Sequence, residues 1–238
     1  MTPFRLWVYL QTTPLFWLTA TLGAYLVADR CSQAARRHPL VNPVAIAIAL
    51  IGTLLELTGT DYQTYFNGAQ FVHFLLGPAT VALAVPLYRN LELVKRNLLP
   101  MAAALIVGAF VAIVSALLVA RGLGAPRAVL VSLAPKSITA GVAMAVSETL
   151  GGAPPLTAAL VIATGVLGAI VVTPLMNALK IRDYAARGFA VGLASHGIGT
   201  ARAFAVDPVA GVFAGVAMGL NAVVTPAIVP SLMPWLAG

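Results

Sequence analysis

The sequence predicts an all-α, polytopic transmembrane protein, and two features of its composition support this. Hydrophobic residues make up 60% of the 238 residues and charged residues only 9%, whereas a soluble domain is about 45–50% apolar and about 25% charged. The charges are also bunched, which leaves these tracts without Asp, Glu, Lys or Arg: 6–28, 62–88, 97–120, 149–179 and 208–238. Because about 20 apolar residues cross the hydrocarbon core of a bilayer as a helix, several helices are long enough to span it, and a soluble domain is excluded.

Apolar segments, about eight in number, follow one another along the chain with short connections between them. They cover residues 6–28, 40–58, 69–88, 98–120, 127–147, 155–179, 188–206 and 208–236. We interpret the first as a retained membrane segment, because Thr12, Thr13 and Pro14 interrupt its apolar run and no small-residue cleavage site follows. Since no long polar stretch separates the segments, residues 1–238 are predicted to form a single transmembrane domain.

The basic residues predict the orientation of the chain in the bilayer. The formal net charge is +7, and nine of the fourteen Lys and Arg residues lie in three short loops, within 29–38, 89–96 and 180–187. Short basic loops between apolar segments face the cytoplasm, so the N-terminus is expected outside. The bases form no patch interleaved with aromatic residues, so the expected partner is the lipid bilayer and not a nucleic acid.

The same rule makes segment 127–147 unusual. If 127–147 and 155–179 each crossed once, the basic loop 180–187 would lie outside; if 127–147 enters and returns to one face, that loop lies inside. Pro135 in the middle of the segment removes a backbone donor and breaks a helix. We therefore favour a re-entrant hairpin whose break faces a cavity, with a single kinked span as the alternative.

Two further interruptions, at 76–80 and 195–202, share the pattern Gly-x-x-Thr, from Gly77 to Thr80 and from Gly197 to Thr200. Segments two to four and six to eight would run in opposite senses, and broken helices at matching positions indicate an inverted-repeat transporter with its binding site at the breaks. The expected helix-breaking residues are Gly77, Pro78, Pro135, Gly197 and Gly199.

Lys136 and Arg202 are cations inside helix-breaking motifs, where a charge costs energy unless it faces water, an acid or a substrate. A new helix N-terminus beside Lys136 would also favour an anion. The alternatives are a lysine that reaches to the membrane interface and an Arg202–Asp207 salt bridge. The residues expected to bind a small carboxylate substrate are Lys136, Ser137, Thr139, Thr200, Arg202, Thr80 and Asn42.

Proton coupling is expected from Glu148, His196 or Glu56, because ionisable groups inside a membrane domain often form proton relays. The alternatives are a buried His196 bonded to a carbonyl and acids exposed at segment ends. Asn42, Asn177 and Asn221 could line a path or bond between helices.

Other chemistries lack the residues that they need. The three histidines have no metal-ligand spacing, Cys31 is alone, and no phosphate-binding loop is present. We therefore expect no metal, no cofactor and no enzyme activity.

Three stretches resemble the signature blocks of the LrgB family, whose members are also called CidB- or YohK-like. They are residues 74–88, 132–139 and 195–203, and the likeness extends from about residue 15 to 235. Asn42-Pro43 is similar as well, whereas Gly141 stands where the second block commonly has proline.

This resemblance implies two functions in a bacterial inner (cytoplasmic) membrane. Some LrgB-like proteins carry glycolate and glycerate or are linked to pyruvate uptake, which favours a proton-coupled secondary transporter of small monocarboxylates. Others are described as holin/antiholin-like regulators of murein hydrolase activity and autolysis, which is the alternative. The resemblance also implies a small LrgA- or CidA-like membrane partner, and a homodimer is a further expectation.

Overall fold

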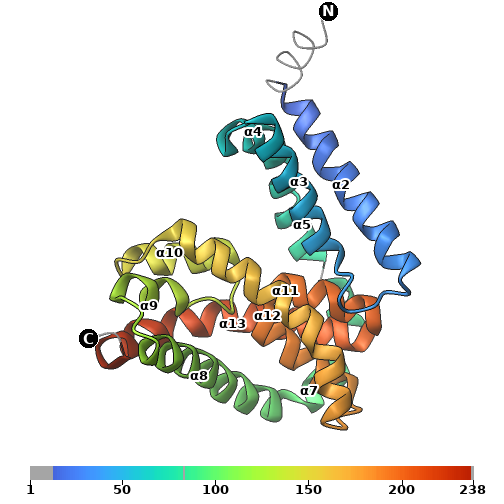
Figure 1. Cartoon of the computed structure of the whole chain (residues 1–238). Coiled ribbons are helices and arrows are strands. Elements are labelled where there is room, and N and C mark those ends of the chain that lie inside the picture. Colours follow the sequence, from blue (N-terminus) through green and yellow to red (C-terminus); the bar gives the residue numbers. More distant parts are fainter. Residues whose placement is uncertain (1–12, 83, 237–238) are drawn as a thin grey trace, which may run out of the picture. The chain divides into compact units, whose positions relative to one another are not determined.

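The structure, a computed structural model, is all-helical and confirms the predicted fold class (Figure 1). It describes residues 13–82 and 84–236, and within these ranges there is no strand. Three described helices are long and apolar enough to cross a membrane: α8 (Leu98–Gly122), α11 (Pro154–Ala178) and α13 (Pro208–Leu236). The start of the first predicted segment, residues 6–12, lies outside the described residues. The eight-segment count and the inverted repeat stay predictions.

The chain divides into two compact units, one ending at Ala84 and the other beginning at Val85. The first contains α2 (Pro14–Ala34), α3 (Pro43–Thr58), α4 (Tyr62–Phe74) and α5 (Leu76–Ala82). Helix α2 packs against α3 and α4. Its contact with α4 depends on Gly68, because an added Cβ there would lie 2.2 Å from the Pro14 carbonyl oxygen.

In the first unit, polar side chains cap the N-terminal ends of α3 and α4. The Asn42 side-chain oxygen accepts hydrogen bonds from the N–H groups of Val44 (2.9 Å) and Ala45 (3.2 Å), which caps α3. At the start of α4, the Asp61 carboxylate accepts a hydrogen bond from the Thr64 hydroxyl at 2.5 Å and another from the Thr64 N–H at 3.0 Å. These hydrogen bonds stabilise the carboxylate and lower the pKa of Asp61.

The third predicted segment, 69–88, is divided among α4, α5 and α6 (Ala84–Arg89). The interruption lies at Leu75, one residue before the predicted block 76–80, and Gly77 and Pro78 sit in the first turn of α5. Proline is tolerated there, since the first N–H groups of a helix have no intrahelical acceptor. The side chain of Thr80 lies outside the described residues.

Helix α12 (Tyr184–Val206) is central to the second unit and packs against α8, α11 and α13 (Figure 1). The remaining helices of this unit are α7 (Leu91–Arg96), α9 (Arg127–Leu133) and α10 (Ala140–Thr149). Glycines allow α12 and α13 to approach closely: an added Cβ at Gly188 would lie 2.0 Å from the Ala210 carbonyl oxygen, and one at Gly192 would lie 2.1 Å from that of Ala214. Small residues at such spacing are typical of helix contacts in membranes.

Helix α8 shows how the second unit divides its apolar surface. One stripe is buried at intervals of four residues and consists of Met101, Leu105, Ala109, Ile113 and Leu117. The other faces expose large apolar side chains, including Leu99, Val107, Phe110 and Val119. A helix that is apolar on every face fits a bilayer and not water.

Candidate functional site

The first helix break lies between α9 and α10. Helix α9 ends at Leu133 and α10 begins at Ala140, so Pro135 and Lys136 stand in the connection. At about 1.5 Å per residue, helices of 7 and 10 residues are roughly 10 and 15 Å long. Neither alone crosses a hydrocarbon core of about 30 Å.

Lys136 in this break has a polar neighbour, Ser137. Its side chain is half-buried, and Nζ lies 3.4 Å from the hydroxyl of the buried Ser137. No acidic side chain forms a salt bridge with Lys136 among the described residues. Thr139, at the N-cap of α10, makes no side-chain capping bond. The break therefore places an ammonium group and an uncapped helix N-terminus next to each other in the chain, a combination that suits an anion.

The second break lies inside α12. Ser195 (φ −133°, ψ 17°) and His196 (φ 41°, ψ −135°) have non-helical backbone angles. Both residues lie within the interruption predicted at 195–202, immediately before Gly197, the first glycine named there as a helix breaker. Gly199 contributes by leaving room, because an added Cβ there would lie 2.7 Å from the Cβ of Ser195.

The carbonyl group of Leu193, just before this break, has a side-chain donor. Asn221 Nδ2 of α13 donates to the Leu193 oxygen at 2.9 Å. The Thr225 hydroxyl donates in turn to Asn221 Oδ1 at 2.8 Å, which fixes the orientation of the amide. Both side chains are buried, so this pair satisfies a buried carbonyl that would otherwise cost free energy.

The two breaks meet at Val161 of α11. The Val161 carbonyl lies 2.9 Å from His196 Nε2, and the Val161 side chain shares a buried cluster with Ile138 and Ala143 from the first break and α10. The Thr200 hydroxyl donates to the His196 carbonyl at 2.8 Å. Residues 133–139 and 193–200, far apart in sequence, thus pack on the same part of α11.

Two glycines of α11 make room for the α12 break. An added Cβ at Gly165 would lie 2.7 Å from His196 Cε1, and one at Gly168 would lie 1.6 Å from Ser195 Oγ. Sequence reasoning missed both glycines and Thr225. The one feature of the sequence that could have indicated these three residues is that each is a small or hydroxyl-bearing residue within a long apolar tract.

The remaining candidate residues are dispersed. Asn42 is a helix cap in the first unit, and Glu56 and Glu148 are exposed. His196 is buried and bonded to a carbonyl, which is one of the two arrangements that the sequence left open.

Arg202 lies away from the first break. Its Nη2 donates to Thr173 Oγ1 at 3.5 Å, and Thr173 follows Val161 by twelve residues, or about 18 Å along α11. The structure therefore does not bring Arg202 to the Val161 region. Asp207 accepts from the Val209 N–H at 2.8 Å and so caps α13.

Residues 21–235 match the LrgB-like family. The chain belongs to this family. It is 34% identical over 221 residues to an uncharacterized protein, YwbG, of Bacillus subtilis, a match that covers 92% of this chain and 97% of the relative. It is 33% identical over 225 residues to the holin-like protein CidB of Staphylococcus aureus, and 28% identical over 224 residues to the antiholin-like protein LrgB of Bacillus mycoides; each match covers 94% of this chain and 97% of the relative.

These relatives confirm the resemblance that the three sequence blocks predicted. Family membership and the three long apolar helices together make this LrgB-like chain a membrane protein. No solved structure matches the chain.

Proposed function

We propose that this LrgB-like protein is a secondary transporter of small monocarboxylates of the glycolate, glycerate or pyruvate type. The observation that carries the proposal is Lys136, a half-buried cation that forms no salt bridge within the described residues and stands in a helix break. A carboxylate at this point accepts hydrogen bonds from Nζ, from the Ser137 hydroxyl and from the first N–H groups of α10. Thr139 offers a further hydroxyl.

Transport also requires the site to open to each side of the membrane in turn. The convergence of both breaks on α11 supports this, because non-helical backbone at membrane depth is tolerated where it is buried in protein or lines a cavity. In the proposed cycle the two inverted halves move against each other, and a proton is carried by His196, Glu148 or Glu56. The proposal needs no metal, cofactor or catalytic group.

Uptake of labelled pyruvate, glycolate and glycerate into proteoliposomes, with and without a pH gradient, tests this function. Lys136→Ala is expected to lower uptake by about tenfold or more, because one charged contact of roughly 1.4 kcal/mol or greater is lost. Lys95→Ala is the matched control, since Lys95 is exposed and pairs only with the neighbouring Glu92 among the described residues. Unchanged uptake by correctly inserted Lys136→Ala would remove Lys136 from the site.

A second function is a holin/antiholin-like role in controlling murein hydrolase activity and autolysis, with a small LrgA- or CidA-like partner or a second copy of the chain. The names of the relatives support it, and they fit this role more directly than they fit transport. Release of an entrapped dye from proteoliposomes, with no uptake of the three acids, is the result that this function predicts. Saturable uptake without dye release favours the transporter.

A further inference from the structure

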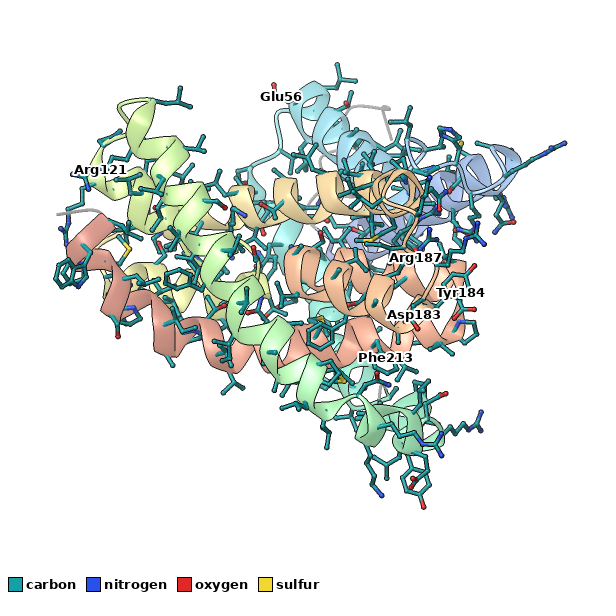
Figure 2. The ribbon with its side chains drawn as sticks, turned by 90° about the horizontal axis from the view of Figure 1, so that it is seen from below. Glu56, Arg121, Asp183, Tyr184, Arg187 and Phe213 are labelled. Carbon is teal, nitrogen blue, oxygen red and sulfur yellow. The ribbon has the colours of Figure 1, made fainter. Side chains whose placement is uncertain are left out.

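A groove of about 460 Å³ lies between α8 and α12 in the second unit and also contacts α13. Its apolar lining includes Met101, Ala104 and Gly108 of α8, Phe189 and Leu193 of α12, and Phe213 of α13. The polar side chains that line it, within the described residues, are Asn97 and Asp183, which immediately precede α8 and α12. Figure 2 shows Asp183 and Phe213 on α12 and α13, with α8 running diagonally in front. Cavities of about 300–1,000 Å³ hold small organic ligands, so this α8–α12 groove has room for one.

The α8–α12 groove closes part-way along both helices. An added Cβ at Gly108 would lie 3.1 Å from the Leu193 side chain, so the helices touch at this point. Gly108 follows Asn97 by eleven residues and Leu193 follows Asp183 by ten, which is roughly 15–16 Å of helix. Because the hydrocarbon core is about 30 Å thick, the groove has the length of one leaflet.

This length favours an acyl chain over a helix as the occupant. The acyl chain of a phospholipid ends near the middle of the bilayer, as the groove does. A membrane-spanning helix of another protein is about 10–12 Å wide and would extend past the closed end.

Two basic loops stand at the open end of the α8–α12 groove. Asn97 and Asp183, the lining residues at this end, adjoin or belong to loops 89–96 and 180–187, in which six Lys and Arg residues outnumber two acids. The positive-inside rule predicts both loops on the cytoplasmic side. A lipid whose chain enters there belongs to the cytoplasmic leaflet, whose anionic phospholipids are attracted to bases beside a membrane helix.

Arg96 is the base closest in sequence to the groove, two residues before α8 begins. It is exposed and forms no salt bridge within the described residues. Both acids of the two loops have partners: Glu92 pairs with Lys95 at 3.2 Å, and Asp183 caps the first turn of α12. A phosphate group at this end of the groove therefore meets a net positive charge.

We propose that the α8–α12 groove binds one acyl chain of an anionic phospholipid, whose phosphate accepts hydrogen bonds from the Arg96 guanidinium group. The lipid fills the space between two helices of the unit that contains both helix breaks, and so stabilises their packing. This interaction goes beyond the proposed transport function and does not depend on it.

Thermal unfolding of the purified full chain in a neutral detergent, at constant ionic strength, tests the lipid site. Phosphatidylglycerol and phosphatidylcholine with the same acyl chains are added separately at increasing mole fractions in the micelle. The melting temperature is expected to rise saturably with phosphatidylglycerol, since a ligand of the native state stabilises it, and to respond to phosphatidylcholine only at higher fractions. Arg96→Gln should weaken the apparent phosphatidylglycerol affinity about fivefold, as for one base beside an anionic surface. Arg30→Gln removes an exposed base of the first unit and should leave this affinity unchanged.

Variants that fill the groove locate the acyl chain. Ala104→Phe places a ring in the groove from α8 and should weaken the apparent phosphatidylglycerol affinity by about tenfold or more. Ala103→Phe is the matched control, because Ala103 is an exposed neighbour that does not line the groove, and it should keep the response. If Ala104→Phe does not fold, Ala186→Phe fills the groove from α12 and should weaken the affinity in the same way.

Equal responses to the two lipids would overturn the anionic headgroup, and an intact phosphatidylglycerol response in both groove variants would overturn the groove as the binding site. A dimer of the unmodified chain that Ala104→Phe converts to a monomer, with the lipid response unchanged, would assign the groove to a second copy of the chain instead. The lipid site and the transport function fail separately, since Lys136→Ala is expected to lose uptake and keep the lipid response.

Discussion

Asn221 hydrogen-bonds the backbone immediately before the break in α12. Its amide donates to the Leu193 carbonyl, and Thr225 holds the amide in orientation. Asn221→Ala leaves a buried carbonyl without this donor, which costs about 1–3 kcal/mol. For a chain of this size, that corresponds to a melting temperature lowered by at least about 2–4 °C, measured by thermal unfolding in detergent.

Asn67→Ala, at an exposed position of α4, is the control and should unfold close to the temperature of the unmodified chain. Thr225→Val should have a smaller effect than Asn221→Ala, because it removes the orienting bond and keeps the donor to Leu193. An Asn221→Ala protein that unfolds at the unmodified temperature would show that the Leu193 carbonyl finds another donor.

At the residue scale, the sequence predicts what depends on local chemistry. Pro135 cannot continue a helix, and its position between α9 and α10 follows from its ring alone. The Ser195–His196 break is different, because its position depends on Gly165 and Gly168 of another helix. The local sequence indicates an interruption within 195–202 and favours its glycines, Gly197 and Gly199, since no single-segment pattern reveals which partner helix leaves room for an imidazole.

At the element scale, the contact between α12 and α13 limits what the second unit tolerates. Gly192→Ala would place a Cβ 2.1 Å from the Ala214 carbonyl oxygen. Backbone cannot rotate away as a flexible side chain does, so the two helices must separate. We expect a loss of at least about 1–3 kcal/mol, as for overpacked cores, and a lower yield of monodisperse protein in size-exclusion chromatography.

Gly219→Ala is the matched control, because this glycine lies in α13 and an added Cβ there meets nothing within 4 Å. Alanine also has the better helix propensity, so this variant should be as stable as the unmodified chain or slightly more stable. A Gly192→Ala protein that behaves like Gly219→Ala would mean that the helices are less tightly packed than the structure shows.

The bounds of the elements follow the sequence closely where apolar tracts are long and uninterrupted. Segments 98–120, 155–179 and 208–236 correspond to α8, α11 and α13 within a few residues, because bilayer thickness sets the length of an apolar helix. Segment 69–88 is divided at Leu75, which is consistent with Pro78, because a proline has no N–H to donate to the carbonyl four residues earlier and its ring clashes with that carbonyl. The inverted repeat is different, since it depends on how elements are arranged and not on their composition.

At the scale of the whole molecule, the predicted orientation depends on three basic loops. Cys31, the single cysteine, is exposed in the last turn of α2, within the first of these predicted loops, 29–38. A membrane-impermeant maleimide should therefore leave Cys31 unlabelled in intact cells and label it once the membrane is opened, because the loop is cytoplasmic. Labelling of Cys31 in intact cells would reverse the orientation of the whole chain.

The same chemistry decides between a re-entrant 127–147 and a single kinked span. In a Cys31→Ser background, cysteine is placed separately at Leu123, Thr149 and Leu179, three exposed positions before α9, at the end of α10 and after α11. A re-entrant hairpin predicts that positions 123 and 149 are labelled from outside and that position 179 is protected. A single span exchanges the last two results, so that 149 is protected and 179 is labelled. Because neither α9 nor α10 is long enough to cross the bilayer alone, and because the single span would put the basic loop 180–187 outside, we expect the hairpin pattern.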